Sequence, residues 1–489
     1  MGAAEPRQPG CSRCAALERQ VCELRQQVAE LKALLSRNSS NSSQPPSSDP
    51  LHAPQRPTKQ PTGRRPGGQP GHQGHHRARL PPERVAVTVD YVPGTCRGCG
   101  AGLPFGRQPH DPDPAWHQVA ELPEVVAVVT EHRGHARTCP CCGAVTREPV
   151  PAPVRAHAVG PRLSALMAYL SGRCRDGRRV VAEFLADVLG VPISLGAVSN
   201  REAEVAAALR PAHDQARRAV AAAGAMNVDE TGWGRDWGAG EARGKGRWLW
   251  VAAARAAAVF AVHAGRGWDG LRAVVLGLAA APAGPGPPAV PGVVTSDRFP
   301  VYDGLPTGAR QVCWAHLLRD FTRWSEPGGH SGSAMVMGSD ARAAAKRVLR
   351  LWRAFRAGTI DRPALRAGVG PLRTRLGRIL RAGTRLASPR DAKAAAFCRN
   401  LLRIEPALWT FASVEGVEPT NNHAERCLRP AVLWRKNCYG SRSERGCRFV
   451  ERMLTVVTTL RLRGKAVLDY LARAIQAHRA GSPAPSLLA

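Results

Sequence analysis

The sequence has few acidic residues and very few lysines for its length. Its 489 residues include 69 Lys and Arg but only 38 Asp and Glu, a formal net charge of 69 − 38 = +31 at pH 7. Seven of the cationic residues are Lys, which leaves 69 − 7 = 62 Arg. Such a charge attracts polyanions, and the guanidinium group makes bidentate contacts with phosphate. Nucleic acid is therefore the expected partner.

Long apolar runs are also missing. No stretch of about 18 uninterrupted apolar residues is present, and the N-terminus has no basic-then-apolar signal pattern. We therefore expect neither a membrane span nor export, and a cytoplasmic protein. The 14 cysteines are then expected to be metal ligands or buried thiols, because the cytosol keeps thiols reduced. The length predicts roughly three or four domains.

A short heptad pattern lies near the N-terminus. Apolar residues recur at alternating steps of four and three, at Leu17, Val21, Leu24, Val28, Leu31 and Leu35. This pattern predicts a coiled-coil helix in residues 1–37 that joins two copies of the chain. A single amphipathic helix packed on its own chain is the alternative.

Residues 38–82 are rich in Ser, Pro and Gly and cannot bury enough apolar surface to fold alone. Between Leu51 and Pro82 this linker has six Lys or Arg, among them Arg64 and Arg65, and no acid. It is suited to lie along phosphates as a disordered basic arm. A solvated linker without a ligand is the alternative.

Two Cys-x-x-Cys pairs follow, Cys96 with Cys99 and Cys139 with Cys142, and each runs into a Gly. Two thiolate pairs on tight turns suit a tetrahedral structural zinc. We expect a zinc ribbon in residues 83–150, with a strand over residues 119–129 between the pairs. Cys141, His132 and His135 are possible substitute ligands.

Residues 151–224 are expected to be helical. Two amphipathic helices flank a turn at residues 190–196 that contains Gly190 and Gly196. This arrangement permits a helix-turn-helix-like DNA reader, and a plain helical spacer is the equal alternative.

The pattern then changes to strands. We expect strands at residues 225–231, 247–252, 258–262, 292–297 and 310–314, the first three as a meander. The first carries Asp229 and the fourth ends in Asp297. Asp229 is favoured over Glu230, because neighbouring residues on a strand point to opposite faces. From Ala315 to about Glu415 the chain is mostly helical and basic.

Residues 419–430 set one carboxylate among amides and guanidiniums. In a helix, Asn422, Glu425, Arg426 and Arg429 would share one face. Such a cluster suits a metal-ligating acid beside phosphate-binding arginines. A capping box, with Asn422 as the N-cap, is the alternative. A basic loop that includes Arg435 and Lys436 follows.

Asp229, Asp297 and Glu425 thus come on a first strand, a fourth strand and a late helix. This is the order of acids in the ribonuclease-H-like fold, in which the first and fourth strands are neighbours and the late helix crosses their ends. Converging carboxylates bind Mg²⁺, or Mn²⁺, and leave positions for water and phosphate. Two such ions support in-line phosphoryl transfer.

The chain resembles transposases of the insertion sequence 66 family, which are DDE transposases. The resemblance rests on the ordered series of zipper, Asn-Ser-Ser-Asn-Ser-Ser-Gln-Pro-Pro-Ser linker, Gly-Gly-Gln-Pro-Gly-His-Gln-Gly, paired Cys-x-x-Cys-Gly, Val-Asp-Glu-Thr at 228–231, Ser-Asp-Arg at 296–298, Cys-Trp-Ala-His at 313–316 and Thr-Asn-Asn-His-Ala-Glu-Arg at 420–426.

Several roles are what this resemblance implies. It makes Asp229, Asp297 and Glu425 the catalytic triad that holds two Mg²⁺ ions, and the four paired cysteines the zinc ligands. It implies a helical insertion between the second Asp and the Glu, and it makes Cys313 and His316 a Cys-x-x-His that we expect to be structural. The candidate DNA-binding residues are Arg64, Arg65, Arg426, Arg429, Arg435 and Lys436.

The expected fold is multidomain α+β, with a ribonuclease-H-like catalytic domain built on a mixed sheet. The expected divisions are 1–37 zipper helix, 38–82 disordered basic linker, 83–150 zinc ribbon, 151–224 helical DNA-binding region, 225–326 first catalytic part, 327–415 helical insertion, 416–448 second catalytic part and 449–489 C-terminal helices.

The expected activity is metal-dependent cleavage at the ends of an insertion sequence, followed by 3′-hydroxyl strand transfer into target DNA. Expected partners are DNA, a second copy through the zipper, and small accessory proteins that such elements often encode. A bacterial, nucleoid-associated location goes with this activity. The alternatives are a DNA-binding regulator that no longer cuts and a nuclease without strand transfer.

Overall fold

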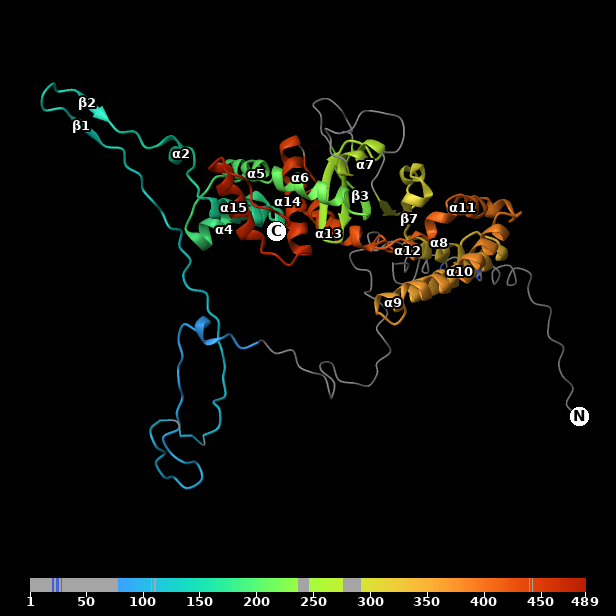
Figure 1. Cartoon of the computed structure of the whole chain (residues 1–489), viewed down its shortest axis with the longest axis horizontal. Coiled ribbons are helices and arrows are strands. Elements are labelled where there is room, and N and C mark those ends of the chain that lie inside the picture. Colours follow the sequence, from blue (N-terminus) through green and yellow to red (C-terminus); the bar gives the residue numbers. More distant parts are fainter. Residues whose placement is uncertain are drawn as a thin grey trace, which may run out of the picture. The chain divides into compact units, whose positions relative to one another are not determined.

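The structure is a computed structural model, and it describes residues 20, 21, 23–25, 28, 78–106, 108–109, 111–235, 246–275, 292–438, 440–441 and 443–489 (Figure 1). Arg64, Arg65 and most of the expected zipper lie outside these residues. The chain divides into two compact units, Gln55–Val128 and the combination of Met1–Pro54 with Val129–Ala489. None of the helices in the described ranges combines the length and apolar character that a bilayer crossing requires.

The described part of the first unit has little regular structure. It contains a 3₁₀ turn, η2 (Pro82–Arg84), and one isolated bridge between Thr95 and Gly102. The strand expected over residues 119–129 is wrong, since this stretch has no regular secondary structure and most of its valines are exposed. An alternating apolar pattern makes a strand only where another strand pairs with it.

The second unit begins with a small hairpin of β1 (Ala136–Thr138) and β2 (Val145–Arg147), then α2 (Ala152–Arg155). The expected helical region follows and is confirmed as α3 (Pro161–Ala168), a π-helix (Tyr169–Cys174), α4 (Arg178–Leu189), α5 (Leu195–Ala208) and α6 (Arg210–Ala221). Gly190 ends α4 in the left-handed conformation, at φ 64°. The Ser194 side chain caps α5 by accepting from the Ala197 N–H.

A five-stranded mixed sheet forms the centre of the second unit. Its strands are β3 (Ala225–Arg235), β4 (Gly246–Ala254), β5 (Ala257–His263), β6 (Val293–Ser296) and β7 (Arg310–Val312). Their spatial order is β5-β4-β3-β6-β7, with β3–β4 and β4–β5 antiparallel and β3–β6 and β6–β7 parallel. All five expected strands are confirmed, and the first and fourth strands are neighbours.

Alternate residues of the central strands enter different cores. Leu249 and Val251 of β4 pack in a core with α3, α5, α6, α13 (Asn422–Cys438), α14 (Glu444–Leu462) and α15 (Val467–Arg479). Trp250 and Ala252 pack in a second core with α7 (Trp268–Val275). The sheet is therefore covered on both faces, as expected for a strand buried on both sides.

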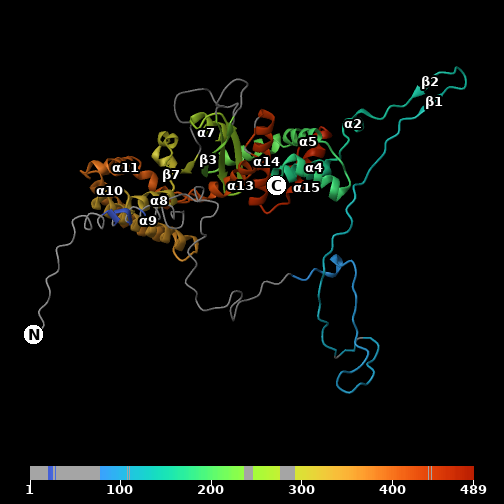
Figure 2. The ribbon, with the colours of Figure 1, turned by 180° about the vertical axis from the view of Figure 1, so that it is seen from behind.

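A separate helical core follows β7. It is built from α8 (Trp314–Ser325), α9 (Gly332–Arg356), α10 (Arg362–Gly383), α11 (Ala392–Arg403) and α12 (Thr410–Ser413), with 3₁₀ turns at Pro389–Asp391 and Glu405–Leu408. Two further 3₁₀ turns, Pro300–Gly304 and Thr307–Ala309, lie between β6 and β7. Figure 2 shows α8, α9, α10 and α11 gathered beyond β7. The side-chain Nε2 of Gln311, a residue of β7, donates to the Leu408 carbonyl at 3.1 Å and ties this core to β7.

The last three helices pack on the face of the sheet that carries Leu249 and Val251. They are α13 (Asn422–Cys438), α14 (Glu444–Leu462) and α15 (Val467–Arg479). The two expected C-terminal helices are thus confirmed as α14 and α15.

Helix α14 satisfies the outer edge of β5 through side chains. The backbone N–H groups of Ala258, Phe260 and Val262 donate to Thr459 Oγ1 (3.1 Å), Thr455 Oγ1 (3.0 Å) and Glu451 Oε1 (2.6 Å). These acceptors are four residues apart on the helix, a rise of about 6.0 Å, and the donors are two apart on the strand, a rise of about 6.7 Å. The near match of the two spacings lets one straight helix serve three consecutive edge donors.

Replacing Thr455 by Val tests this edge interaction. Thr455 is fully buried, so the change leaves the Phe260 N–H without its acceptor, and we expect the free energy of unfolding to fall by about 1–3 kcal/mol. Urea denaturation of the purified protein measures it. Thr458→Val on the same helix is the control, because this half-buried hydroxyl has no hydrogen bond within the described ranges, and an equal loss in both variants would contradict the assignment.

Candidate active site

The three expected acids come from elements that meet at one end of the sheet. Asp229 is in β3, Asp297 directly follows β6, and Glu425 is in the first turn of α13. Strands β3 and β6 are parallel and pair Ala225 with Val293 and Asn227 with Thr295. The same offset of 293 − 225 = 68 positions brings Asp229 opposite Asp297.

The electrostatic surroundings of Asp229 agree with the placement of these acids at one end of the sheet. Burial raises the pKa of the Asp229 carboxyl group well above its ordinary value, and the nearby charges of Glu230, Asp297 and Glu425 raise it further. A cation would relieve this repulsion, and carboxylate oxygens are the ligands that Mg²⁺ prefers. The chemistry of three carboxylates therefore suits a divalent metal. In the described part of the chain, no three His, Cys, Asp or Glu side chains are grouped so that they could hold a metal ion.

Glu230 has a different environment from Asp229. Its side chain is 1% exposed, accepts from Tyr302 Oη at 2.6 Å and from Arg266 Nε at 2.9 Å, and forms an ion pair with Arg266. Arg266 is itself held over the Phe299 ring, at 3.7 Å from its centroid. Glu230 is thus used in a buried hydrogen-bond network, which supports the choice of Asp229 as the acid facing the cluster.

Residues 419–421 attach the start of α13 to the sheet. The Pro419 carbonyl accepts from the Trp314 N–H at 2.8 Å, and the Thr420 carbonyl accepts from the Asn227 side chain at 3.1 Å. Asn421 is fully buried and donates from its side chain to the Val228 carbonyl at 2.9 Å. These bonds fasten the helix start to the two β3 residues that precede Asp229.

The capping-box alternative for Glu425 is wrong. Helix α13 begins at Asn422, and the Glu425 N–H donates to the Asn421 carbonyl at 3.2 Å, so Asn421 is the N-cap and the third helical residue is Ala424. The Asn421 N–H donates instead to Cys313 Sγ at 3.1 Å. The Glu425 carboxylate is therefore not engaged in a reciprocal cap.

The rest of this motif fixes the rotation of the helix. His423 Nε2 lies 2.9 Å from the Ala254 carbonyl, and Ala424, Cys427 and Leu428 are buried in the core. Buried residues at these spacings form one face of the helix, which leaves Glu425 and Arg426 on other faces.

Cys313 and His316 lie at the same junction. Cys313 is buried, which raises the pKa of its thiol to about 11. His316 Nδ1 lies 3.7 Å from Glu425 Oε1, and burial lowers the pKa of His316 to about 4, so the imidazole is neutral at pH 7. His316 is thus a neutral neighbour of the candidate acid, a position that the sequence pattern did not indicate.

The expected DNA-binding residues near α13 differ in their surroundings. Arg426, Arg429 and Lys436 are exposed. Arg435 is half-buried and donates to Thr231 Oγ1 at 3.1 Å and to the Gly232 carbonyl. Arg435 therefore also ties the end of α13 to β3.

The two cysteine pairs have the same local geometry, one in each compact unit. The Cys96 N–H donates to the Ala101 carbonyl at 2.8 Å and the Gly100 N–H to the Cys96 carbonyl at 2.9 Å, and the turn at Cys139 repeats both bonds at the same lengths. Hydrogen bonds from backbone N–H groups lower the pKa of the Cys96 and Cys139 thiols. Each turn has the form of a metal-binding knuckle, and zinc binding stays a prediction.

Comparison with known proteins gives two family matches. The family model described as "Transposase IS66 family" matches residues 164–448, and that described as "Family of unknown function (DUF6444)" matches residues 8–78. No curated protein and no solved structure matches the chain.

Replacing Asn421 by Leu tests the attachment of α13. The change removes the donor to the Val228 carbonyl inside the core, and we expect the free energy of unfolding to fall by about 1–3 kcal/mol. Asn422→Ala is the matched control, since Asn422 is half-buried and its side chain makes no hydrogen bond within the described ranges. Chemical denaturation compares the two, and equal losses would contradict the role given to Asn421.

Proposed function

The chain belongs to the IS66 family of transposases, whose family model covers more than half of it, and from this membership we propose that it cuts DNA at the ends of an insertion sequence and joins those ends to target DNA. The observation that supports this chemistry is that β3, β6 and the start of α13, which carry Asp229, Asp297 and Glu425, adjoin at one end of the mixed sheet. The net charge of +31 supports DNA as the substrate.

A ribonuclease-H-like catalytic domain is part of the proposal. The strand order β5-β4-β3-β6-β7 supports it, because the first strand then lies between the second and the fourth, with only the first three strands antiparallel. The separate core of α8 to α12 supports a helical insertion between the second Asp and the Glu. Exposure of Val21, Leu24 and Val28 supports self-association through the zipper.

In the proposed mechanism Asp229, Asp297 and Glu425 hold divalent metal. Bound Mg²⁺ supplies charge stabilisation for the attacking and leaving oxygens of in-line phosphoryl transfer. Asn421 and the backbone of residues 419 and 420 keep the start of α13, and with it Glu425, against β3. His316 lies beside the Glu425 carboxylate and is neutral, so it does not form an ion pair with it.

Two displacements follow in this proposal. Water attacks a phosphodiester bond at the element end and releases a 3′-hydroxyl, and this hydroxyl then attacks a phosphodiester bond of the target, where another 3′-oxygen leaves. Neither step requires a covalent enzyme intermediate, so no Ser or Tyr nucleophile is assigned.

Substitution of the acids tests the catalytic assignment. Asp229→Asn, Asp297→Asn and Glu425→Gln should each lower Mg²⁺-dependent nicking of DNA that carries the element ends by at least about a hundredfold, because each removes a negatively charged ligand. Asp340→Asn is the control, since this acid is exposed on α9 and the charge change is the same.

Undiminished nicking in all three acid variants would refute the assignment. Glu230→Gln distinguishes the two adjacent acids, and we expect a smaller loss from it, because Gln still accepts the hydrogen bond of Tyr302. A greater loss from Glu230→Gln than from Asp229→Asn would transfer the role to Glu230.

Zinc analysis tests the cysteine pairs. The purified chain should carry roughly one Zn²⁺, and Cys96→Ser and Cys139→Ser should each release most of it, because a structural site needs four ligands. Cys174→Ser is the control, since Cys174 is also exposed and lies outside both pairs and their turns. Elemental analysis of dialysed protein measures the metal, and an unchanged zinc content in both serine variants of the pairs would contradict the prediction.

A further inference from the structure

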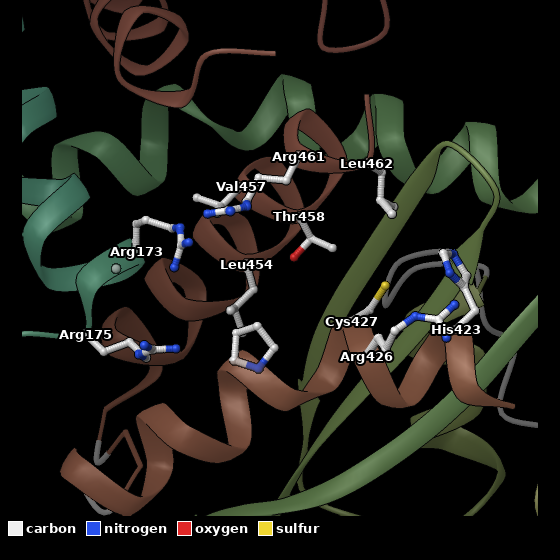
Figure 3. Close-up of a pocket in the computed structure, with 12 residues that line it drawn as sticks. Arg173, Arg175, His423, Arg426, Cys427, Leu454, Val457, Thr458, Arg461 and Leu462 are labelled. Carbon is white, nitrogen blue, oxygen red and sulfur yellow. The ribbon is translucent and has the colours of Figure 1, made fainter. Parts of the chain in front are cut away.

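A pocket of about 420 Å³ lies between the π-helix, α13 and α14. Figure 3 shows Arg173 and Arg175 on one side of it and Arg426 on the other, with Thr458 and Arg461 of α14 between them. The volume is within the range of about 300–1,000 Å³ that is usual for small-molecule sites. The cysteine pairs and the acid cluster contribute no side chain to it.

Four guanidinium groups line the pocket without acids beside them. Arg173, Arg175, Arg426 and Arg461 all lie in its wall, and no Asp or Glu is among the lining residues. Across the described ranges none of the four has an ion pair, whereas arginines such as Arg178, Arg266, Arg298 and Arg479 are paired. The Nε of Arg173 is buried and has no hydrogen-bond partner within the same ranges. Like charges gathered in this way favour an anion between them.

The backbone that presents these arginines is unusual. Tyr169–Cys174 is a π-helix, a form that is rare and frequent at functional sites. Arg175 ends it at φ 71°, and no other residue except Gly has a positive φ in the described ranges. A Cβ on Gly172 would lie 2.8 Å from Met453 Cε, so Gly at this position lets the π-helix approach α14. Arg175 therefore lines the pocket at a conformational cost.

The remaining wall is apolar and points to more than inorganic phosphate. Cys427, Pro430, Leu454, Val457 and Leu462 supply this surface, and the Thr458 hydroxyl adds a polar group. A ligand with an anionic end and a flat, partly apolar body would use both parts. A nucleotide has this composition, since its phosphate pairs with guanidinium and its base packs on apolar or guanidinium surfaces.

The pocket adjoins the candidate active site through α13. His423 and Arg426 line it, and Glu425 lies between them in sequence on the first turn of the same helix. We propose that this pocket binds one unpaired nucleotide of a DNA strand, with its phosphate on the arginines and its base on the apolar wall. The DNA origin of the nucleotide rests on the proposed function, whereas the binding of a nucleotide does not.

Calorimetric titration of the full chain tests the proposal. The probes are thymidine 5′-monophosphate, inorganic phosphate, a short thymidine oligonucleotide and its abasic counterpart. Thymidine 5′-monophosphate should bind wild-type protein more tightly than phosphate. Arg173→Gln combined with Arg461→Gln should weaken its binding by about tenfold or more, because two charge-assisted bonds are lost.

Two controls separate the pocket from general electrostatics and from misfolding. Arg378→Gln combined with Arg473→Gln removes the same charge from exposed positions on α10 and α15 and should leave binding as in wild type. Thr458→Trp fills the pocket without a change of charge and should also weaken binding. Thermal melts establish that each variant is folded.

Several results would overturn the proposal. Equal affinity for phosphate and thymidine 5′-monophosphate would show that the base does not bind in the pocket. Equal affinity for the abasic and thymidine oligonucleotides would show the same. If the folded double variant Arg173→Gln, Arg461→Gln bound thymidine 5′-monophosphate with wild-type affinity, the nucleotide would not bind in this pocket. Tighter binding of the thymidine oligonucleotide than of the mononucleotide, lost in the same double variant, identifies a DNA strand as the source, and the reverse order refutes it.

DNA cleavage and nucleotide binding in the pocket can be tested separately. Asp229→Asn should bind thymidine 5′-monophosphate as wild type does, since Asp229 is not in the pocket wall. Wild-type protein that binds the nucleotide through these arginines but never nicks end DNA would refute cleavage and leave the pocket assignment in place.

Discussion

Repulsion between carboxylates is the constraint on which the candidate active site depends. Asp229 lies near Glu230, Asp297 and Glu425, and their charges together with burial raise its pKa. Side chains that repel one another stay together only if the backbone beneath them is fixed. The parallel pairing of β3 with β6 fixes the first two elements, and the bonds of residues 419–421 to β3 and α8 fix the third.

The polar residues around the acids affect the charge of the cluster in different ways. Tyr302 and Arg266 hold Glu230 on the other side of β3, so its charge contributes to the field at Asp229 without its carboxylate facing the cluster. Neutral His316 beside Glu425 adds no positive charge to the cluster. Carboxylates on one side of α13 suit the divalent cation that we propose, and the arginines of the pocket suit a phosphate. Opposite potentials thus lie on two sides of a single helix.

Much of this arrangement could be predicted from the sequence, because it depends on local patterns. Short apolar stretches that end in Asp229 and Asp297 predicted both strands and the acids on them. The Tyr302 and Arg266 contacts to Glu230 could not be predicted, since they join residues 72 and 36 positions apart with no pattern of spacing. The strand expected at 119–129 failed for a related reason, because no partner strand pairs with it. The arginine pocket depends on a π-helix and on a positive φ at Arg175, a residue type that does not favour that conformation.

The three side-chain acceptors of α14 along β5 also limit how the protein can assemble. An edge strand with open N–H groups can recruit a strand from another molecule. Here Glu451, Thr455 and Thr459 already occupy those donors, and at the opposite edge Thr410 Oγ1 donates to the Arg310 carbonyl of β7 while Gln311 Oε1 accepts from the Phe411 N–H. Neither side of the sheet is open to β-augmentation. A strand that joined this sheet would first have to displace α14 from β5 or residues 410 and 411 from β7.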